Sequence, residues 1–404
     1  MIVMENINIK TFDWNNEQFL RLIQNFQEKC WKDGLEKGKS FSKEEIAFLR
    51  RLYPESELFL GAYYQKELLA VLGAGPCNVK FNGEPLKAVG IGSWGIDPAV
   101  LSALTKGESE KDAKVYEKNF MEIFQQLLNE LIARIAKSNY DFIYAEPVPF
   151  EFKAIVDCLQ KEWIVLNKNV ENFVRMIGRE AIKVVKEKIG MNILEEQAAK
   201  LIAGLKSERI ESGKLREAKK EEFPKIVEIL NNYTKLHELA RFWTIEEFQR
   251  YLKAFEGVNT KDHESKAEFP ETPFGWGITV WDDAGEIKAA IVWELNEMFF
   301  RNGYSPVLWI HQVGFTEAIL NQDPKEVKRA KVAFMSSFLA QFHLKVYICH
   351  VPMPYYDEKV FDGFMGERRT TPLLMHSLTD KAKPLCELKK LKQFYLPAIE
   401  FKIH

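Results

Sequence analysis

The spacing of hydrophobic residues divides the first half of the chain into helices and strands. Hydrophobic residues recur every three to four positions in segments 15–32, 42–52, 119–137 and 152–161, which predicts amphipathic helices. Apolar runs at 57–64, 68–74, 88–96, 140–145, 163–166 and 172–176 predict strands instead. Asn82-Gly83 separates two of these runs and is a strong signal for a tight hairpin turn.

The same order of elements repeats after a charged helical connector at about 179–208. The second half predicts helices at 223–231, 244–255 and 325–342, and strands at 275–281, 287–293, 307–315, 344–350 and 371–376. Its Asn302-Gly303 turn lies 220 residues after Asn82-Gly83. We therefore predict an α+β protein with homologous modules at 1–178 and 214–404, joined by a helical connector at 179–213, each a mixed, mostly antiparallel sheet flanked by helices.

Three short segments give this repeat a family resemblance. Trp94-Gly-Ile-Asp97-Pro98 is similar to the end of the fourth strand of GNAT N-acyltransferases, and Phe361-Asp-Gly-Phe364 to the end of their fourth helix. Residues 215–226 are similar to the start of a second unit. With the element order, the chain resembles tandem GNAT members such as N-myristoyltransferases and peptidoglycan-bridge aminoacyltransferases. The resemblance implies transfer of an acetyl or longer acyl group from acyl-CoA to the amine of a small molecule or peptide, with the acceptor between the modules.

The family's glycine-rich pyrophosphate loop, Arg/Gln-x-x-Gly-x-Gly/Ala, is missing from both halves. In the second half, Asp323, Pro324 and Glu326 predict a capped helix start whose N–H groups already have a carboxylate partner. In the first half, a longer loop includes Lys106 and Gly107, which can meet a phosphate. We therefore expect coenzyme A in the first module, and the resemblance makes five residues the cofactor-binding candidates: Trp94, Gly95, Ile96, Lys106 and Gly107.

Acyl transfer to an amine needs a base for the amine and an acid for the leaving thiolate. Asp97 ends the fourth strand of the first module and Glu146 follows its fifth, while His311 and Glu317 lie in and after the fourth strand of the second. Tyr356 follows the next strand, where the family often places its tyrosine acid. We take Asp97, Glu146, His311 and Tyr356 as catalytic candidates. Each also has a structural interpretation: capping for the carboxylates, a core position for the histidine and an aromatic loop for the tyrosine.

Other motifs favour structural roles. The string Gly90-x-Gly92-x-x-Gly95 matches a dinucleotide-binding pattern, but it lies inside a predicted strand and opens no helix. Cys349 and His350 are adjacent on a strand and face opposite sides, so they do not form a nucleophile or metal pair. The basic segment 328–331 is interpreted as a solvated helix face. Most of the tryptophans at 276, 281, 293 and 309 are expected in the core.

Composition removes several classes of function. The 404 residues include 56 Lys plus Arg and 58 Asp plus Glu, so no overall basic field favours nucleic acid as a partner. The five cysteines lack Cys-x-x-Cys spacing, which predicts neither a zinc ribbon nor a disulfide framework and fits a reducing compartment. His343 and His350 lack a third spaced ligand, so no metal is predicted. Without a leader-like start or an apolar run of about 18 residues, we predict a cytoplasmic protein with no membrane contact.

Two alternatives stay open at this stage. Because both pyrophosphate loops are missing, the chain fits a catalytically inactive GNAT-like scaffold that binds a metabolite, peptide or protein. A weaker alternative is an aminoacyl-tRNA-dependent transferase, which would need a basic channel. The sequence does not specify the acceptor, the acyl length, the module that binds coenzyme A or the oligomeric state.

Overall fold

A computed structural model gives the fold of the chain. It describes residues 7–11, 56–64, 66–96, 110–145, 163–176, 209–211, 214–255, 275–300, 303–342, 348–351, 365–369, 371–388, 391 and 394–396. The helices predicted at 15–32, 42–52 and 152–161 lie outside these ranges, as does the connector apart from 209–211, which are not helical.

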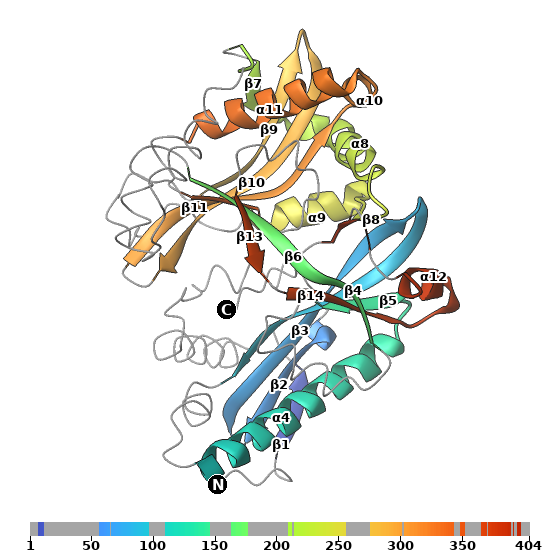
Figure 1. Ribbon diagram of the computed structural model, residues 1–404, viewed down its shortest axis with the longest axis vertical. Helices are drawn as coiled ribbons and strands as arrows, with labels where there is room; N and C mark the ends of the chain where they lie inside the picture. Colours follow the sequence, from blue (N-terminus) through green and yellow to red (C-terminus); the bar gives the residue numbers. More distant parts are fainter. Residues whose placement is uncertain are drawn as a thin grey trace.

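The described strands form one continuous sheet that runs the length of the molecule (Figure 1). The first module contributes five neighbouring strands, antiparallel except for the parallel pair β4 and β5. Their bounds are β1 (Ile7–Thr11), β2 (Phe59–Tyr64), β3 (Glu67–Phe81), β4 (Glu84–Ile96) and β5 (Phe142–Ala145), with a short 3-10 helix, η2 (Ser56–Leu58), before β2.

Helix α4 (Glu110–Ala136) packs on this part of the sheet and begins nine residues earlier than its hydrophobic spacing predicts. The predicted face is confirmed: Ile123, Leu127 and Leu131 are buried with residues from β2 to β5. The 110–118 extension adds charged residues, which follow the helix without contributing to the apolar pattern that marks it.

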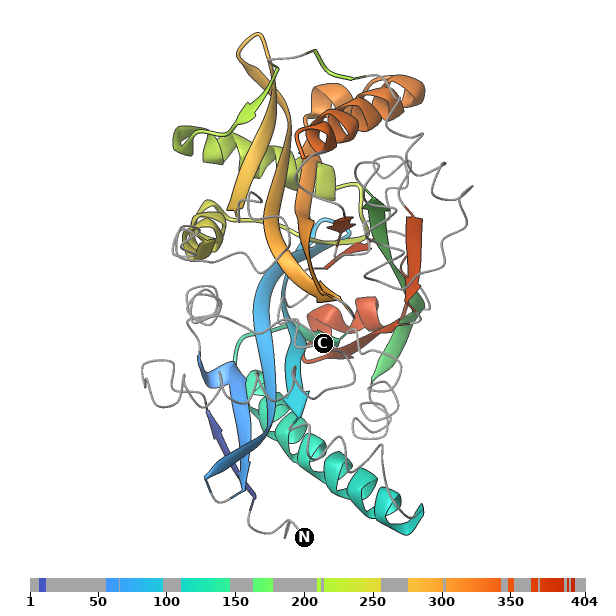
Figure 2. The same ribbon diagram turned by 90° about the vertical axis from the view of Figure 1, so that its left-hand side faces the viewer.

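The second module repeats the arrangement, with β11 and β12 as its parallel pair. In Figure 2 its sheet has helices on both faces. Helix α11 covers one face, and α8 and α9 cover the other. The strands are β7 (Leu215–Glu217), β9 (Gly275–Asp283), β10 (Glu286–Phe300), β11 (Gly303–Phe315) and β12 (Ile348–Val351); the helices are α8 (Phe223–Thr234), α9 (Ile245–Phe255), α10 (Glu317–Leu320) and α11 (Pro324–Ala340).

The modules exchange the strands that complete their half-sheets. Strand β14 (Thr371–Ser377), near the end of the sequence, pairs with β5 of the first module. Strand β6 (Ile164–Met176), before the connector, pairs with β12 of the second module, and β6 and β14 pair with each other. The exchange joins both half-sheets and leaves neither with an open edge at this point. The predicted module boundaries stay a prediction, since the sheet continues across them.

This exchange corrects one expectation from the sequence. Segments 163–166 and 172–176 were expected as two strands that complete the first module, but they form the single strand β6, whose last residues, 173–176, pair with β12. The remaining described elements link the modules or lie at their margins: β8 (Leu239–Arg241), β13 (Met365–Arg369), β15 (Phe394–Tyr395), the 3-10 helices η6 (Lys220–Glu222) and η7 (Asp380–Ala382), and α12 (Lys383–Cys386).

The predicted hairpin turn at Asn82-Gly83 is confirmed by its backbone angles, and a turn at Ala284-Gly285 has similar angles. Asn82 and Gly83, between β3 and β4, have φ of 49° and 90°, the left-handed values that a two-residue hairpin requires. Ala284 and Gly285, between β9 and β10, have φ of 53° and 86°. Asp282 supports this second turn, because its Oδ1 accepts a hydrogen bond from the Gly285 N–H at 2.8 Å.

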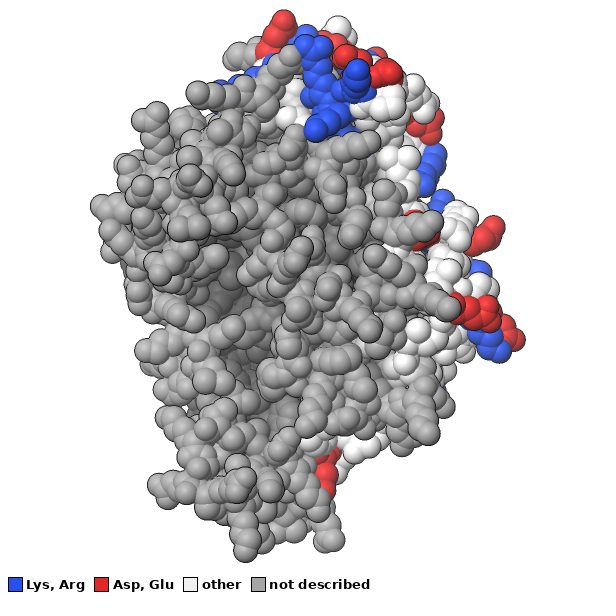
Figure 3. All heavy atoms as spheres, in the orientation of Figure 1, with Lys and Arg blue, Asp and Glu red and all other residues white. Residues whose placement is uncertain are grey.

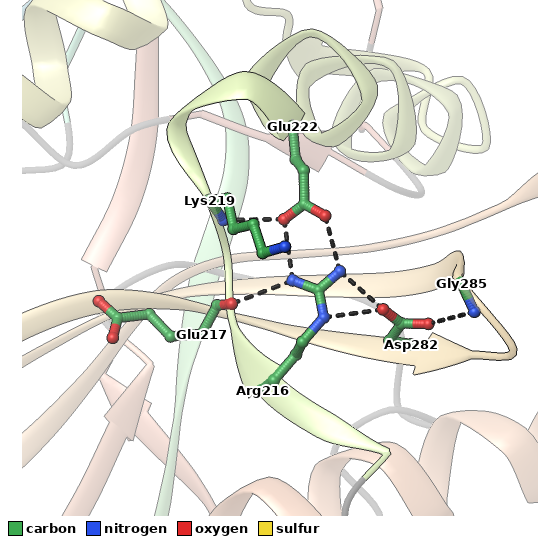
Figure 4. Close-up of polar contacts among 6 residues, drawn as sticks. All are labelled: Arg216, Glu217, Lys219, Glu222, Asp282 and Gly285. Carbon is green, nitrogen blue, oxygen red and sulfur yellow. Dashed lines mark hydrogen bonds and ion pairs between the residues drawn. The ribbon is translucent and has the colours of Figure 1, made fainter.

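An ion-pair network around Arg216 fixes the start of the second module (Figure 4). The Arg216 guanidinium donates two hydrogen bonds to Glu222, at 2.9 and 2.6 Å, and one to Asp282 at 2.7 Å. Because of the Arg216 hydrogen bonds, opposed by burial and helped by the Lys219 N–H, the pKa of Glu222 falls to about 2. The network connects β7 and η6 to the β9–β10 hairpin.

In the parts of the chain that the structure describes, no helix is long and apolar enough to cross a membrane.

Candidate functional site

The central strand of the first module, β4, is longer than the described part of its parallel neighbour, β5. Strand β4 pairs with β5 from Ala88 to Ile91, opposite 142–145, and then continues to Ile96. In this end of β4, Gly92, Gly95 and Ile96 have partners in β3. The β3–β4 register shifts between Val71 and Gly73, so β4 carries an extra residue near its end. The predicted cofactor-binding residues 94–96 therefore lie on the part of β4 that follows its described pairing with β5.

The second module has the same geometry at equivalent positions. Strand β11 pairs with β12 from Val307 to Trp309, and Val307 follows Ala88, the first β4 residue paired with β5, by 219 residues. Strand β11 then continues to Phe315, and its register with β10 shifts near His311. The predicted repeat is thus present in strand pairing as well as in element order.

A strand that extends beyond its neighbour can present backbone donors and acceptors to a ligand. Buried backbone N–H and C=O groups need partners, and an extended molecule that carries amides can supply them as an added strand does. The string at Gly90, Gly92 and Gly95 lies within β4, which confirms that it is a strand and not a loop before a helix. This end of β4 is therefore the backbone site that we consider for the cofactor.

His311 is the one catalytic candidate whose side chain the structure describes. It is 5% exposed on β11, and its Nε2 lies 3.2 Å from Oε2 of Glu294 on β10. Its ring meets Tyr251 of α9 edge-on, with centroids 6.1 Å apart. These contacts give His311 a core position beside an acid. A catalytic role for it stays a prediction.

The other candidates divide between exposed and undescribed positions. Glu317, after β11, is exposed and forms an ion pair with Lys235 at 3.2 Å. The remaining candidates, Asp97, Glu146, Tyr356, Lys106 and Gly107, lie outside the described residues. The structure therefore places β4 of the first module and the His311–Glu294 pair of the second.

The predicted start of α11 is confirmed at its N-cap. Asp323 accepts a hydrogen bond from the Lys325 N–H at 2.9 Å, and Pro324 occupies the first turn. Among the described contacts, Glu326 forms an ion pair with Arg329 instead of closing a capping box. A carboxylate therefore already occupies this helix end, as expected for a module without a pyrophosphate there.

The basic segment 328–331 is only partly a solvated face. Figure 3 shows Lys and Arg side chains interleaved with acidic ones over the end of the molecule that carries α11. Lys328 and Arg329 are exposed. Lys331 is 4% exposed, and its Nζ lies 5.0 Å from the ring centroid of Tyr233, so the expectation was wrong for this residue. The run of charges did not indicate its burial, because Lys331 occupies an inward-facing position of the amphipathic helix.

The tryptophans of the second module pack in the core, as expected. Trp309 is 4% exposed, and Trp281 stacks on Phe334 of α11. Trp293 packs against α11 and donates a hydrogen bond to Thr279 at 3.1 Å. Within the described ranges, no group of three or more His, Cys, Asp or Glu residues is placed to hold a metal ion.

A polar cluster beside His311 was not predicted from the sequence. Trp243 donates a hydrogen bond from Nε1 to Oε1 of Gln312, next to His311, at 2.5 Å. The Arg241 guanidinium lies 3.4 Å from the Trp243 ring centroid. Gln312 within an apolar strand was the sequence signal that could have indicated this cluster, since a buried amide needs hydrogen-bond partners.

Comparison with known proteins supports this architecture. No family model matches the sequence, and no curated protein matches it. Among solved structures, Saccharomyces cerevisiae N-myristoyltransferase with bound myristoyl-CoA is similar over 93% of this chain and 84% of its own, with 14% identity and a TM-score of 0.61. The same yeast enzyme with myristoyl-CoA and inhibitors gives a TM-score of 0.60, with 14% identity over 93% of this chain and 80% of its own. The chain therefore has the GNAT-like N-acyltransferase fold, with two tandem modules.

Proposed function

We propose that the protein is an N-acyltransferase that moves an acyl group from coenzyme A to an amine. The observation that carries this proposal is the central strand β4, which pairs in parallel with β5 from Ala88 to Ile91 and continues to Ile96. The fold shared with an enzyme whose structure holds myristoyl-CoA supports it. The acyl-CoA would lie along Trp94, Gly95 and Ile96.

The backbone of β4 and a few acids and bases would perform the chemistry. Backbone N–H groups near the register shift would donate to the thioester carbonyl oxygen, where negative charge develops. A base, with Asp97 and Glu146 as candidates, would take a proton from the acceptor amine. The amine nitrogen would form a bond to the carbonyl carbon, the carbon–sulfur bond would break, and Tyr356 would protonate the thiolate. His311 is a candidate for orienting the acceptor from the second module.

A few local groups would have to hold the phosphates of coenzyme A, because the chain has a net charge of only −2 and no glycine-rich loop. Lys106 and Gly107 are our candidates in the first module. The corresponding helix start of the second module is capped by Asp323. This asymmetry favours the first module as the cofactor site.

Calorimetric titration with acetyl-CoA, myristoyl-CoA and free coenzyme A tests the proposal. We expect binding of at least one acyl-CoA, with the preferred chain length defining the donor. Lys106→Ala should weaken binding about tenfold or more, since it removes a phosphate contact of about 1.5–3 kcal/mol. Lys325→Ala, at the capped helix of the second module, is the matched control and should bind as the unmodified chain does.

Transfer is then measured by mass spectrometry with small amines and with peptides that have free N-termini. Acylated product that requires the acyl-CoA would support the enzyme and exclude the inactive scaffold. If no coenzyme A species binds, the proposal is wrong and the scaffold becomes the better hypothesis. The cytoplasmic location of this activity stays a prediction.

A further inference from the structure

Arg241, at the end of β8, is a half-buried cation on an aromatic surface. Its guanidinium carbon lies 3.4 Å from the ring centroid of Trp243 and 5.5 Å from that of Tyr251. Among the described residues, no carboxylate forms an ion pair with it. The ring contacts stabilise the cation through its face, and its five N–H donors point outward in the plane of the guanidinium.

Gln312 supplies a second donor on the same indole. Its side chain is 1% exposed, and Oε1 accepts the Trp243 Nε1 hydrogen bond. The Gln312 Nε2 atom is buried and has no hydrogen-bond partner among the described residues. A buried amide donor without an acceptor is costly, and in native proteins it indicates that a water or ligand oxygen completes the site.

The shared indole is held in place from several sides. The Asn231 side chain donates to the Trp243 carbonyl and accepts from its N–H, both at 2.8 Å. The Tyr251 ring lies 5.1 Å from the Trp243 ring, between centroids. Arg241 and Gln312 are therefore fixed relative to each other before any ligand binds, which lowers the cost of binding.

The nearby acids already have partners. Glu294 lies 3.2 Å from His311 Nε2. Glu247 lies 3.9 Å from Arg250 and accepts from the Thr244 N–H at 3.4 Å. The cluster thus offers an anion two kinds of hydrogen-bond donor: one charged guanidinium and one neutral amide.

We propose that this cluster, defined by Arg241, Trp243, Tyr251 and Gln312, binds the carboxylate of a small molecule through the Arg241 guanidinium and the Gln312 amide. A guanidinium matches a planar carboxylate with two parallel hydrogen bonds. One guanidinium and one amide balance a singly charged group better than a phosphate. The proposal does not depend on acyl transfer, since it rests on the contacts of Arg241 and Gln312 alone.

The probe is 4-fluorobenzoate, with 4-fluorobenzamide as the uncharged analogue and phenyl phosphate as the alternative anion. Binding to the full chain is measured by fluorine NMR line broadening and by displacement with the unlabelled acid. We expect the carboxylate to bind about tenfold or more tightly than the amide. Arg241→Gln should abolish this preference, and Gln312→Met, which keeps the volume and removes the donor, should reduce it.

Lys80→Gln is the matched control, because the Lys80 ammonium also lies over an aromatic ring, 5.1 Å from the centroid of Phe242. It should keep the preference for the carboxylate. If Arg241→Gln does not fold, Arg241→Lys, which keeps the charge without the planar fork, replaces it and should bind more weakly. Equal binding of acid and amide, no binding of either, tighter binding of phenyl phosphate, or an unchanged preference in the Arg241 variant would overturn the proposal.

Discussion

Gly314 of β11 lies directly against the backbone of Ile229 in α8. A Cβ atom on Gly314 would come within 2.8 Å of the Ile229 carbonyl oxygen and of the Leu230 Cα. Because these atoms belong to a helix backbone, they cannot move aside as a flexible side chain does. Gly314 lies 219 residues after Gly95, so the repeated glycine has a packing role in the second module.

Gly314→Ala is therefore expected to destabilise the protein by about 1–3 kcal/mol, the usual cost of overpacking. Urea unfolding followed by fluorescence measures the change. Gly285→Ala is the comparison: its Cβ would meet nothing within 4 Å, but its φ is +86°, so only backbone strain of about 1 kcal/mol applies. A larger loss for Gly285→Ala than for Gly314→Ala would contradict the packing explanation.

Removing the Glu222 carboxylate should make the free energy of unfolding less dependent on pH. The folded-state pKa of Glu222 is about 2, below its ordinary 4.5. Its stabilisation is therefore complete above about pH 4.5 and is lost as the pH falls toward 2. Glu222→Gln should cost about 1–2 kcal/mol at pH 7 and much less at pH 3. Glu221→Gln, at the exposed neighbouring position, should change stability little at either pH.

Shortening Leu374 should destabilise the first module, although β14 lies near the end of the sequence. Leu374 is fully buried and pairs with Ala145 of β5 and Val165 of β6. Leu374→Ala should cost about 2–4 kcal/mol and raise amide hydrogen exchange in residues 142–145. Leu236→Ala, at a position 50% exposed, serves as the control. Unchanged amide hydrogen exchange in β5 would argue against the pairing of β14 with the first module.

The thiols of Cys77 and Cys386 should react slowly in the folded protein. Burial raises the pKa of each thiol to about 11. At pH 8 only about one thiol in a thousand is then the reactive thiolate. In a variant with serine at 30, 158 and 349, labelling with a thiol reagent should be slow without urea and fast in urea. Fast labelling of the native variant would show that these sites are accessible.

The local pattern determined most of the described elements. Alternation and turn chemistry were enough to predict β2, β4, β9 and β14, and the left-handed turn at Asn82-Gly83 follows from those two residues alone. Periodicity located α8, α9 and α11 because one face of each helix is buried. The repeat could also be predicted, since both modules use the same order of these local signals.

Tertiary structure decided which strands meet. The sequence of 164–176 shows that this segment can be a strand. It does not show that the strand pairs with β12 of the other module, because backbone hydrogen bonds are the same for any partner strand. The inward position of Lys331 and the shared indole of Arg241 and Gln312 depend in the same way on segments far apart in the sequence. Local preference fixes each element, whereas burial against distant elements fixes its partners and the site they form.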